Sequence, residues 1–407
     1  MSEALTINEV VVTGVGVVTP LECGSGMQDF WDKLCSGINS IKPIRGFDVR
    51  GNKCDVGGEI SGFETFLDYD LSKEYDRCAK LFMLASQYAL NDAGAEQELV
   101  KSMGVVIGTI LGGIGSGEQY LNEKLFLSKK GNSSLLKQYC LHTIADSIKK
   151  MLSLRGSAIS INTACCSGAD AIRIAAAQVR SGRARIVLAG GADVLSEFAF
   201  RGFSSLNALT TDGKVRPFDK KRTGLALSEG AGAVILEEKN HARKRGAKIY
   251  CELVAAGSSM DAYHMVRPHK DGEGLSRAIQ IALTNTEGTT GSVDYICAHG
   301  TGTQYNDNME TKAIKHAFRE NVSTIKISSI KSMIGHMLGA ASAVEAISCI
   351  KAIETSTIPP TINYEEADPG CDLQYVFNTA IKKDIKTCMS LSAGFGGQNT
   401  VLIFRKE

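Results

Sequence analysis

Short apolar, β-branched runs of strand length alternate along this chain with segments of helical periodicity. The runs typical of strands fall at residues 10–18, 104–110, 158–162, 185–189, 231–237, 248–256, 295–298, 326–329, 373–378, 387–392 and 400–404. Helical patterns occupy residues 76–92, 169–180, 275–285, 307–318 and 336–353. Alternation at this pace predicts an α/β architecture in which helices cover the faces of the sheets.

The same set of elements occurs twice. The charged stretch 238–247 ends the first set, and a new strand pattern starts directly after it. We therefore expect two similar halves, residues 1–246 and 247–407, the first enlarged by insertions such as 120–149. No low-complexity linker separates them, so the halves should pack as one body. The 407 residues, which would suit two or three domains, then correspond to one duplicated fold.

Composition excludes several classes of protein. Lys and Arg number 45 against 44 Asp and Glu, so no global charge draws the chain to nucleic acid or to an anionic membrane. No apolar run of about 18 residues predicts a membrane span. The 12 cysteines form no Cys-x-x-Cys pair, and the first residues lack the pattern of a signal peptide. We expect a cytoplasmic protein whose thiols are mostly buried.

Many of the 42 glycines follow the predicted strands directly. Sites in open α/β sheets lie at strand ends, where the backbone turns tightly and approaches a ligand closely. Glycine also serves ordinary turns, so this pattern alone does not prove a site. The nucleotide-binding motifs fail: residues 14–19 and 113–118 lack the full dinucleotide fingerprint, and no P-loop occurs. The sequence therefore predicts a strand-end site without a nucleotide cofactor.

Cys165 is the candidate nucleophile. Residues 157–170 run from a strand into a helix, which places Cys165 near the first helical turn. Free amides and the helix dipole there are expected to lower the pKa of its thiol, and neighbouring amides could hold an oxyanion. Cys166 is turned by about 100° around the helix axis, so only one thiol can point into a pocket. Two buried structural thiols are the alternative interpretation.

Two histidines supply possible partners for the thiol. His299 ends a predicted strand before a glycine- and threonine-rich turn, while Lys331 and His336 follow another strand. The glycine-rich loop 394–399 follows a third strand. The remaining histidines should be surface or ordinary polar residues: His142, His241, His264, His269 and His316. No pair has metal-ligand spacing, so the sequence predicts no metal site.

The motifs together resemble the β-ketoacyl-acyl carrier protein synthases, the elongating condensing enzymes of type II fatty acid and polyketide synthesis. The matching segments span nearly the whole chain in family order: 163–168, 189–193, 216–219, 261–265, 299–303, 329–336, 358–361 and 394–397. The resemblance implies the thiolase fold, with two duplicated βαβαβαββ halves in a five-layered α-β-α-β-α body. This implication agrees with the repeat of elements seen in the sequence.

The resemblance also implies roles for single residues. Cys165 would accept the acyl chain from acyl carrier protein, and His299 and His336 would bind the malonyl thioester and promote its decarboxylation. The amides of Cys165 and Phe395 would form the oxyanion hole, with Phe395 also acting as a gate. Further residues implied in support of the site or in substrate binding are Lys331, Glu345, Thr301, Thr303, Leu111, Phe203 and Ala393. No metal or cofactor is implied, because the phosphopantetheine arrives on the carrier protein.

Some positions depart from the usual fatty-acid pattern. Ala393 replaces a phenylalanine and Gln398 a threonine, and segment 302–310 looks more like aromatic-polyketide ketosynthases, which pair with a chain-length partner. We therefore expect a type II polyketide ketosynthase in such a heterodimer, with homodimeric fatty-acid elongation as the alternative. An acidic carrier protein could dock on Lys73, Arg77 and Lys80, spaced along one predicted helix.

The sequence alone leaves two other functions to consider. A non-catalytic chain-length subunit is disfavoured because such subunits lack the nucleophile that Cys165 provides. A thiolase acting on coenzyme A esters is disfavoured because thiolases use a second cysteine in place of one of the two histidines.

Overall fold

The computed structural model describes residues 8–67, 75–125, 131–286 and 293–407. Its main strands are β1 (Val10–Val18), β4 (Gly104–Gly108), β5 (Ala158–Ile161), β6 (Ile186–Asp193), β7 (Gly230–Glu238), β8 (Cys251–Met260), β9 (Tyr295–Cys297), β10 (Lys326–Ser328), β13 (Thr387–Gly394) and β14 (Gln398–Arg405). They are hydrogen-bonded in the order β10-β9-β13-β14-β8-β1-β7-β6-β4-β5.

The strand order repeats between the two halves of the chain. Counted from the centre, the first half runs β1, β7, β6, β4, β5 and the second runs β8, β14, β13, β9, β10. In each half the chain visits these positions in the same sequence, with the same antiparallel inner and parallel outer pairs. The halves join where β1 pairs antiparallel with β8, Val11 opposite Glu252.

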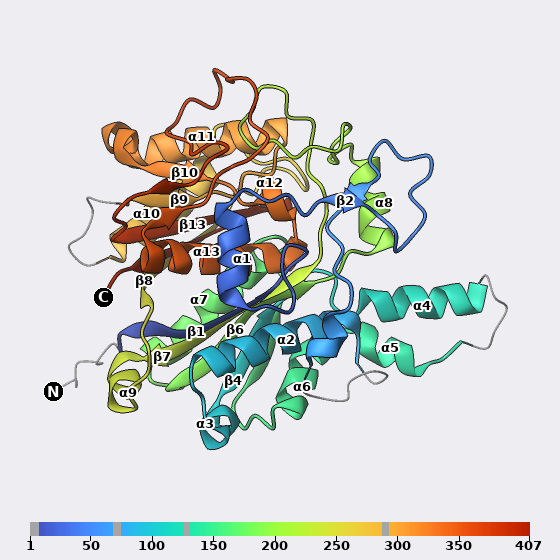
Figure 1. Cartoon of the computed structure of the whole chain (residues 1–407), viewed down its shortest axis with the longest axis vertical. Helices are drawn as coiled ribbons and strands as arrows, with labels where there is room; N and C mark the ends of the chain where they lie inside the picture. Colours follow the sequence, from blue (N-terminus) through green and yellow to red (C-terminus); the bar gives the residue numbers. More distant parts are fainter. Residues whose placement is uncertain (1–7, 68–74, 126–130, 287–292) are drawn as a thin grey trace.

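Helices form three layers around the strands (Figure 1). In the centre, α7 (Ser167–Arg180) and α13 (Ala341–Thr355) contact each other and strands of both halves. On the outer side of the first half lie α2 (Arg77–Asp92) and α6 (His142–Met151). Outside the second half, α10 (Glu273–Thr284) packs on β8 and β14, and α11 (Gln304–Phe318) packs on α10. The layers are therefore α-β-α-β-α, as expected for the thiolase fold.

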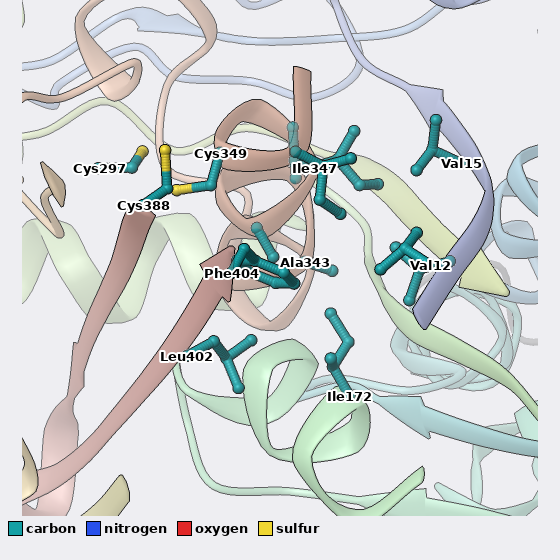
Figure 2. Packing of buried hydrophobic residues seen from close by; sticks show 14 of the residues in the cluster. Val12, Val15, Ile172, Cys297, Ala343, Ile347, Cys349, Cys388, Leu402 and Phe404 are labelled. Atoms are coloured by element: carbon teal, nitrogen blue, oxygen red, sulfur yellow. The ribbon is translucent and has the colours of Figure 1, made fainter. Parts of the chain in front are cut away.

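The core of the central layer explains the position of α13. Residues from Ala341 to Ile353 are all buried, and most of them are apolar, as suits a helix that is covered on every side. Ala343 and Ile347 of α13 pack with Ile172 of α7 and with side chains from both halves of the sheet (Figure 2). These side chains include Val12, Val15, Leu402 and Phe404, all at most 1% exposed. The strand ends that carry the site are thus anchored to one rigid core.

Several elements differ from the sequence expectation. The helix predicted over 336–353 begins at Ala341, because Leu338 adopts a left-handed φ of 53° and a 3₁₀ turn (Leu338–Ala340) precedes the helix. Segment 373–378 is not a strand; it makes only isolated bridges through Tyr375 and Phe377. The insertion 120–149 contains the end of α4 (Ile114–Leu125), α5 (Ser134–Tyr139) and most of α6. Of these, α4 and α5 project from the body at the right of Figure 1, whereas α6 packs on α2, β4 and β5.

The remaining elements were not predicted and lie around these layers. They are α1 (Met27–Cys35), α3 (Gln97–Ser102), α4 (Ile114–Leu125), α8 (Glu197–Ser205), α9 (Lys239–Lys244), α12 (Lys331–Ile334), β2 (Lys42–Pro43), β3 (Val56–Gly57), β11 (Thr357–Ile358) and β12 (Ile381–Lys382). All 12 cysteines are free and nine are buried, as expected. Across the described residues, no helix has the length and apolar character to cross a membrane.

Candidate active site

Three side chains from distant parts of the chain meet at the strand ends. The Cys165 Sγ and one ring nitrogen each of His299 and His336 all lie within 4.8 Å of one another, and all three residues are buried. Cys165 follows β5, His299 follows β9, and His336 follows α12. The duplicated fold therefore brings one residue of the first half against two of the second.

A strained turn presents Cys165. Ala164 adopts a left-handed φ of 51°, and the Thr163 amide donates to Ser167 Oγ at 2.9 Å. Because α7 starts only at Ser167, Cys165 lies two residues before the helix. Backbone conformations of this kind persist where the surroundings enforce them, and they are common at functional sites.

The two adjacent cysteines point in different directions. Cys165 Sγ lies 3.1 Å from His336 Nε2. Cys166 Sγ instead donates to the Gln398 carbonyl at 3.4 Å, on the side of β14. The structure thus places Cys165 with the histidines and Cys166 in a packing role.

The expected lowering of the Cys165 pKa is wrong for the resting protein. Burial raises the pKa of this thiol to about 12, although Lys331 and a hydrogen bond from the Phe395 amide act in the opposite direction. Desolvation disfavours the thiolate more strongly than the nearby donors favour it. Sequence reasoning identified the helix start but could not weigh complete burial.

The hydrogen bonds fix the tautomer of both histidines. The Leu338 amide donates to His336 Nδ1 at 3.2 Å, and Lys331 Nζ donates to His299 Nδ1 at 3.3 Å. Burial, together with Lys331, holds both histidine pKa values well below 6.5, so the rings are neutral. A neutral ring whose Nδ1 accepts carries its proton on Nε2. Both Nε2 groups are therefore donors, and that of His336 faces Cys165 Sγ.

Lys331 is buried and contacts three acceptors. Its Nζ donates to the His299 carbonyl at 2.7 Å, to His299 Nδ1 and to Glu345 Oε1. Burial raises the pKa of Glu345 above the usual carboxyl range, with Lys331 opposing the shift. Lys331 thus reaches the reacting centre through His299, as the expected supporting pair would.

The same three ligand atoms could geometrically surround a metal ion, which ligand spacing in the sequence did not predict. A metal bound at Nε2 would require the proton on Nδ1. However, both Nδ1 atoms face donors, namely the Leu338 amide and Lys331 Nζ. The neighbouring groups therefore favour hydrogen-bond donation from Nε2 over metal binding there.

The loop after β13 forms the other wall of the site. Phe395 stacks on Phe203, with ring centroids 5.3 Å apart. A Cβ on Gly394 would lie 3.1 Å from the Cys165 amide nitrogen, so glycine leaves that amide open to approach. The Gly396 amide donates to the Met265 carbonyl at 2.7 Å and fastens the loop to its neighbour.

These groups lie at the end of a cavity of about 430 Å³. Of the residues predicted for substrate binding, Phe203 and Ala393 line it, as do Thr301 and Thr303, which were predicted to support the site. Leu111 does not; it packs against the same apolar cluster as Phe203.

Sequence reasoning missed other lining residues: Leu206, Asn207, Thr223, Val266, Arg267, Gln304, Tyr305 and Asn306. His264, expected to be an ordinary polar residue, also lines the cavity. The motif at residues 261–265 was the sequence signal that could have placed His264 at the cavity. Arg267 is the one Lys, Arg, Asp or Glu among the lining residues of the described chain, and its guanidinium lies 5.3 Å from the Tyr305 ring.

The structure does not support the three predicted basic residues together as a docking site for the carrier protein. Arg77 donates to Glu229 at 2.7 Å and lies over the Phe63 ring, so an internal carboxylate already engages its guanidinium. Lys73 lies outside the described residues, and α2 begins only at Arg77. Lys80 is half-buried on the same helix.

Fold and site together define a condensing enzyme of the thiolase fold with a cysteine and two histidines. Residues 8–242 match the family model of the β-ketoacyl synthase N-terminal domain, and residues 250–365 match that of the C-terminal domain. The chain belongs to the β-ketoacyl synthase family. This confirms the predicted family, fold class and enzyme class, an acyltransferase.

Relatives and solved structures cover almost all of the chain. It is 40% identical to 3-oxoacyl-[acyl-carrier-protein] synthase 2 of Synechocystis, covering 98% of both chains. It is 34% identical to a putative polyketide β-ketoacyl synthase 1 of Streptomyces halstedii, covering 97% of both. Among solved structures, the ishigamide ketosynthase/chain length factor superposes with a TM-score of 0.93 at 33% identity, covering 98% of this chain and 100% of that one.

Proposed function

We propose that this protein condenses an acyl chain held on Cys165 with malonyl-acyl carrier protein, as the ketosynthase of a type II polyketide system. The observation that carries the proposal is the convergence of Cys165 Sγ with two neutral histidines whose Nε2 groups are hydrogen-bond donors. Decarboxylative condensation needs a nucleophile that holds the acyl chain and donors that hold an enolate oxygen.

In the first half-reaction, Cys165 Sγ attacks the carbonyl of the acyl thioester. The C–S bond to the carrier breaks, and the released carrier thiol takes up the proton of Cys165. The amides of Cys165 and Phe395 hold the developing oxyanion, which Gly394 leaves room for. The thiol is protonated at rest because its pKa is raised, so donation from His336 Nε2 matters mainly when negative charge develops on the sulfur.

In the second half-reaction, the malonyl thioester carbonyl accepts hydrogen bonds from His299 Nε2 and His336 Nε2. Loss of CO₂ leaves an enolate whose oxygen these two donors stabilise. The enolate carbon attacks the acyl-Cys165 carbonyl, the C–S bond breaks, and the cysteine sulfur takes up a proton. Lys331 keeps the His299 donor on Nε2 through its bond to Nδ1.

The partner in this proposal is acyl carrier protein, and its phosphopantetheine arm brings the substrates. Thr301 and Thr303 line the cavity, their hydroxyls 2.9 Å apart, where they could bind the amides of such an arm. Arg267 lines the same cavity, is solvent-exposed and suits the arm's phosphodiester. In this proposal Arg267, rather than Arg77, is the basic residue that contacts the carrier protein. No cofactor other than the phosphopantetheine arm is needed. A cytoplasmic location and the division into halves 1–246 and 247–407 belong to the same proposal.

The proposal also includes the biosynthetic pathway, polyketide synthesis rather than fatty-acid elongation. A solved relative pairs a ketosynthase with a chain length factor, and another shows a ketosynthase with a type II polyketide acyl-carrier protein, at 33% identity each. The 40% identity to a 3-oxoacyl-[acyl-carrier-protein] synthase 2 favours fatty-acid elongation as the second candidate. Intact mass of the purified complex separates them, since a heterodimer supports the polyketide pathway and a homodimer the fatty-acid pathway.

The chemistry is tested by incubating the protein with acyl- and malonyl-acyl carrier protein. We expect a β-ketoacyl product and an acyl adduct on Cys165. An adduct on Cys166, or full product formation by Cys165→Ala, would contradict the assignment. Cleavage of acetoacetyl-coenzyme A would favour a thiolase instead.

A further inference from the structure

We propose that Asp193 is a positioning residue that holds the His336 ring in its donating tautomer by anchoring the turn after it. The inference rests on the proposed function, because it concerns the donor that binds the malonyl thioester. Asp193 ends β6 in the first half of the chain, whereas His336 belongs to the second.

The carboxylate of Asp193 is fully buried and accepts four hydrogen bonds. Thr109 Oγ1 and the Leu111 amide donate to Oδ1, each at 2.9 Å. The Ile110 amide donates to Oδ2 at 2.9 Å, and the Gly339 amide donates to the same oxygen at 2.7 Å. Within the described chain, Asp193 forms no ion pair with Lys or Arg. Three backbone amides and one hydroxyl therefore compensate this charge.

One of those bonds reaches the turn that orients His336. The Leu338 amide fixes the ring by donating to Nδ1, and Leu338 has a left-handed φ of 53°. Such a conformation in a branched residue is unfavourable and needs support from its surroundings. The next amide, that of Gly339, is held by Asp193. Asp193 thus anchors the peptide unit directly after the one that selects the tautomer.

The backbone of His336 itself is held separately. Its amide donates to the Ala226 carbonyl at 2.8 Å, and its carbonyl accepts from the Ser228 amide at 3.0 Å. Loss of the Asp193 contact should therefore leave His336 in place but free its ring to exchange tautomers. A ring protonated on Nδ1 presents no donor at Nε2 to the substrate.

A carboxylate suits this position better than an amide. All its neighbours are donors, and an asparagine would turn its own NH₂ group toward one pair of them. The same contact can be disturbed from the other side, because a Cβ on Gly339 would lie 2.6 Å from Asp193 Oδ2. An asparagine could still keep its carbonyl oxygen on the Gly339 amide, whereas alanine removes both oxygens. Two single substitutions, Asp193→Ala and Gly339→Ala, therefore perturb one hydrogen bond from opposite ends.

The experiment measures the two half-reactions separately in the full-length protein. Acyl transfer to Cys165 is followed by intact mass, and CO₂ release from malonyl-acyl carrier protein is followed with the acylated enzyme. We expect both variants to lose decarboxylation on the order of 10- to 100-fold, while acyl transfer changes little. The negative charge of Asp193 raises the pKa of Cys165, so its removal should not impair acylation.

Asp219→Ala is the matched control. Asp219 is also fully buried and accepts hydrogen bonds from the backbone amides of Lys221, Glu365 and Glu366 at 2.5 to 2.6 Å, but it does not line the cavity. This variant should lose stability without changing the ratio of the half-reactions. If Asp193→Ala does not fold, Gly339→Ala provides the test.

Two results would overturn the inference. One is a folded variant that decarboxylates at the wild-type rate; the other is an equal loss in both half-reactions. A wild-type protein without condensation activity would contradict the proposed function instead. The double variant should be no worse than the poorer single variant, because both changes remove the same contact.

Discussion

Replacing Lys331 by methionine should separate its contribution to stability from its proposed role in positioning His299. In the single variant, Glu345 loses its partner at Oε1, and its Oε2 already has no hydrogen-bond partner among the described residues. Removing one member of a buried pair costs about 3–5 kcal/mol of stability. Replacing both members, in Lys331→Met with Glu345→Met, should recover part of this loss, because the unpaired Glu345 carboxyl is gone. The His299 carbonyl and Nδ1, which also lose their donor, should keep the recovery incomplete.

The stability loss of the single variant should depend on pH with a defined sign. Burial raises the folded-state pKa of Glu345 above its unfolded value, and removing Lys331 raises it further. Between the two values the folded state holds a proton that the unfolded state has released. Stability then falls as pH rises, by at most about 1.4 kcal/mol per pH unit. The double variant lacks the group and should not show this slope.

Decarboxylation should stay low in both variants. Without Lys331 Nζ, the Nδ1 of His299 has lost the donor that holds the proton on Nε2. The assay compares urea unfolding between pH 5 and 8 with CO₂ release from malonyl-acyl carrier protein. A matched control is Lys239→Met, which disrupts the buried pair with Glu252 and should lower stability alone. Recovery of activity in the double variant would refute the proposed role of Lys331 in positioning His299.

Three more outcomes follow from the site. Alkylation of Cys165 by iodoacetamide should accelerate with pH up to at least 9, because its thiol pKa is raised to about 12; a plateau below pH 8 would contradict this. Arg267→Ala should raise KM for carrier-bound substrates about 10- to 100-fold, as the loss of one charged hydrogen bond requires, and leave short thioesters that lack the phosphate unaffected. Equal effects on both kinds of substrate would argue against a phosphate contact. Gly394→Val should abolish acyl transfer, since its Cβ would lie 3.1 Å from the Cys165 amide. In the control Gly51→Val the Cβ meets open space, so this variant should strain the backbone but leave acyl transfer unchanged.

Much of the fold follows from local patterns. Strand lengths and helical periodicity located most of the central elements, and the order of the repeat gave the duplicated architecture. The start of α13 did not follow, because helical propensity extends back to His336 while the tertiary contacts of Leu338 impose a left-handed turn. The helices of insertion 120–149 were also missed. α4 is only weakly amphipathic and gives little periodic signal. α6 is strongly amphipathic, with Ile144, Ala145 and Ile148 on its buried face, so its pattern was present in the sequence.

The site, like the fold, could be predicted from the sequence only in part. Cys165, His299 and His336 could be selected because each follows a strand, and strand ends share an edge of the sheet. The resting pKa of Cys165 could not be foreseen, because it depends on how completely other segments bury the thiol. Arg267 carried no signal of its own, since its place on the cavity depends on how the loop before it lies.

The duplication explains why positioning groups at this site come from both halves. The proposed nucleophile, Cys165, lies beyond β5 of the first half, while His299 follows β9 and His336 follows α12 in the second, so their geometry depends on how the halves are joined. Lys331 contacts His299 from within the second half, whereas Asp193 binds the Gly339 amide in the turn after His336 from across the junction. Cβ atoms on Gly168 and Gly191 would lie 2.8 and 2.6 Å from the Gly339 carbonyl, so glycine is needed at both positions for the halves to approach this closely. Some of the 42 glycines therefore serve the close contact that brings Cys165 and the two histidines together.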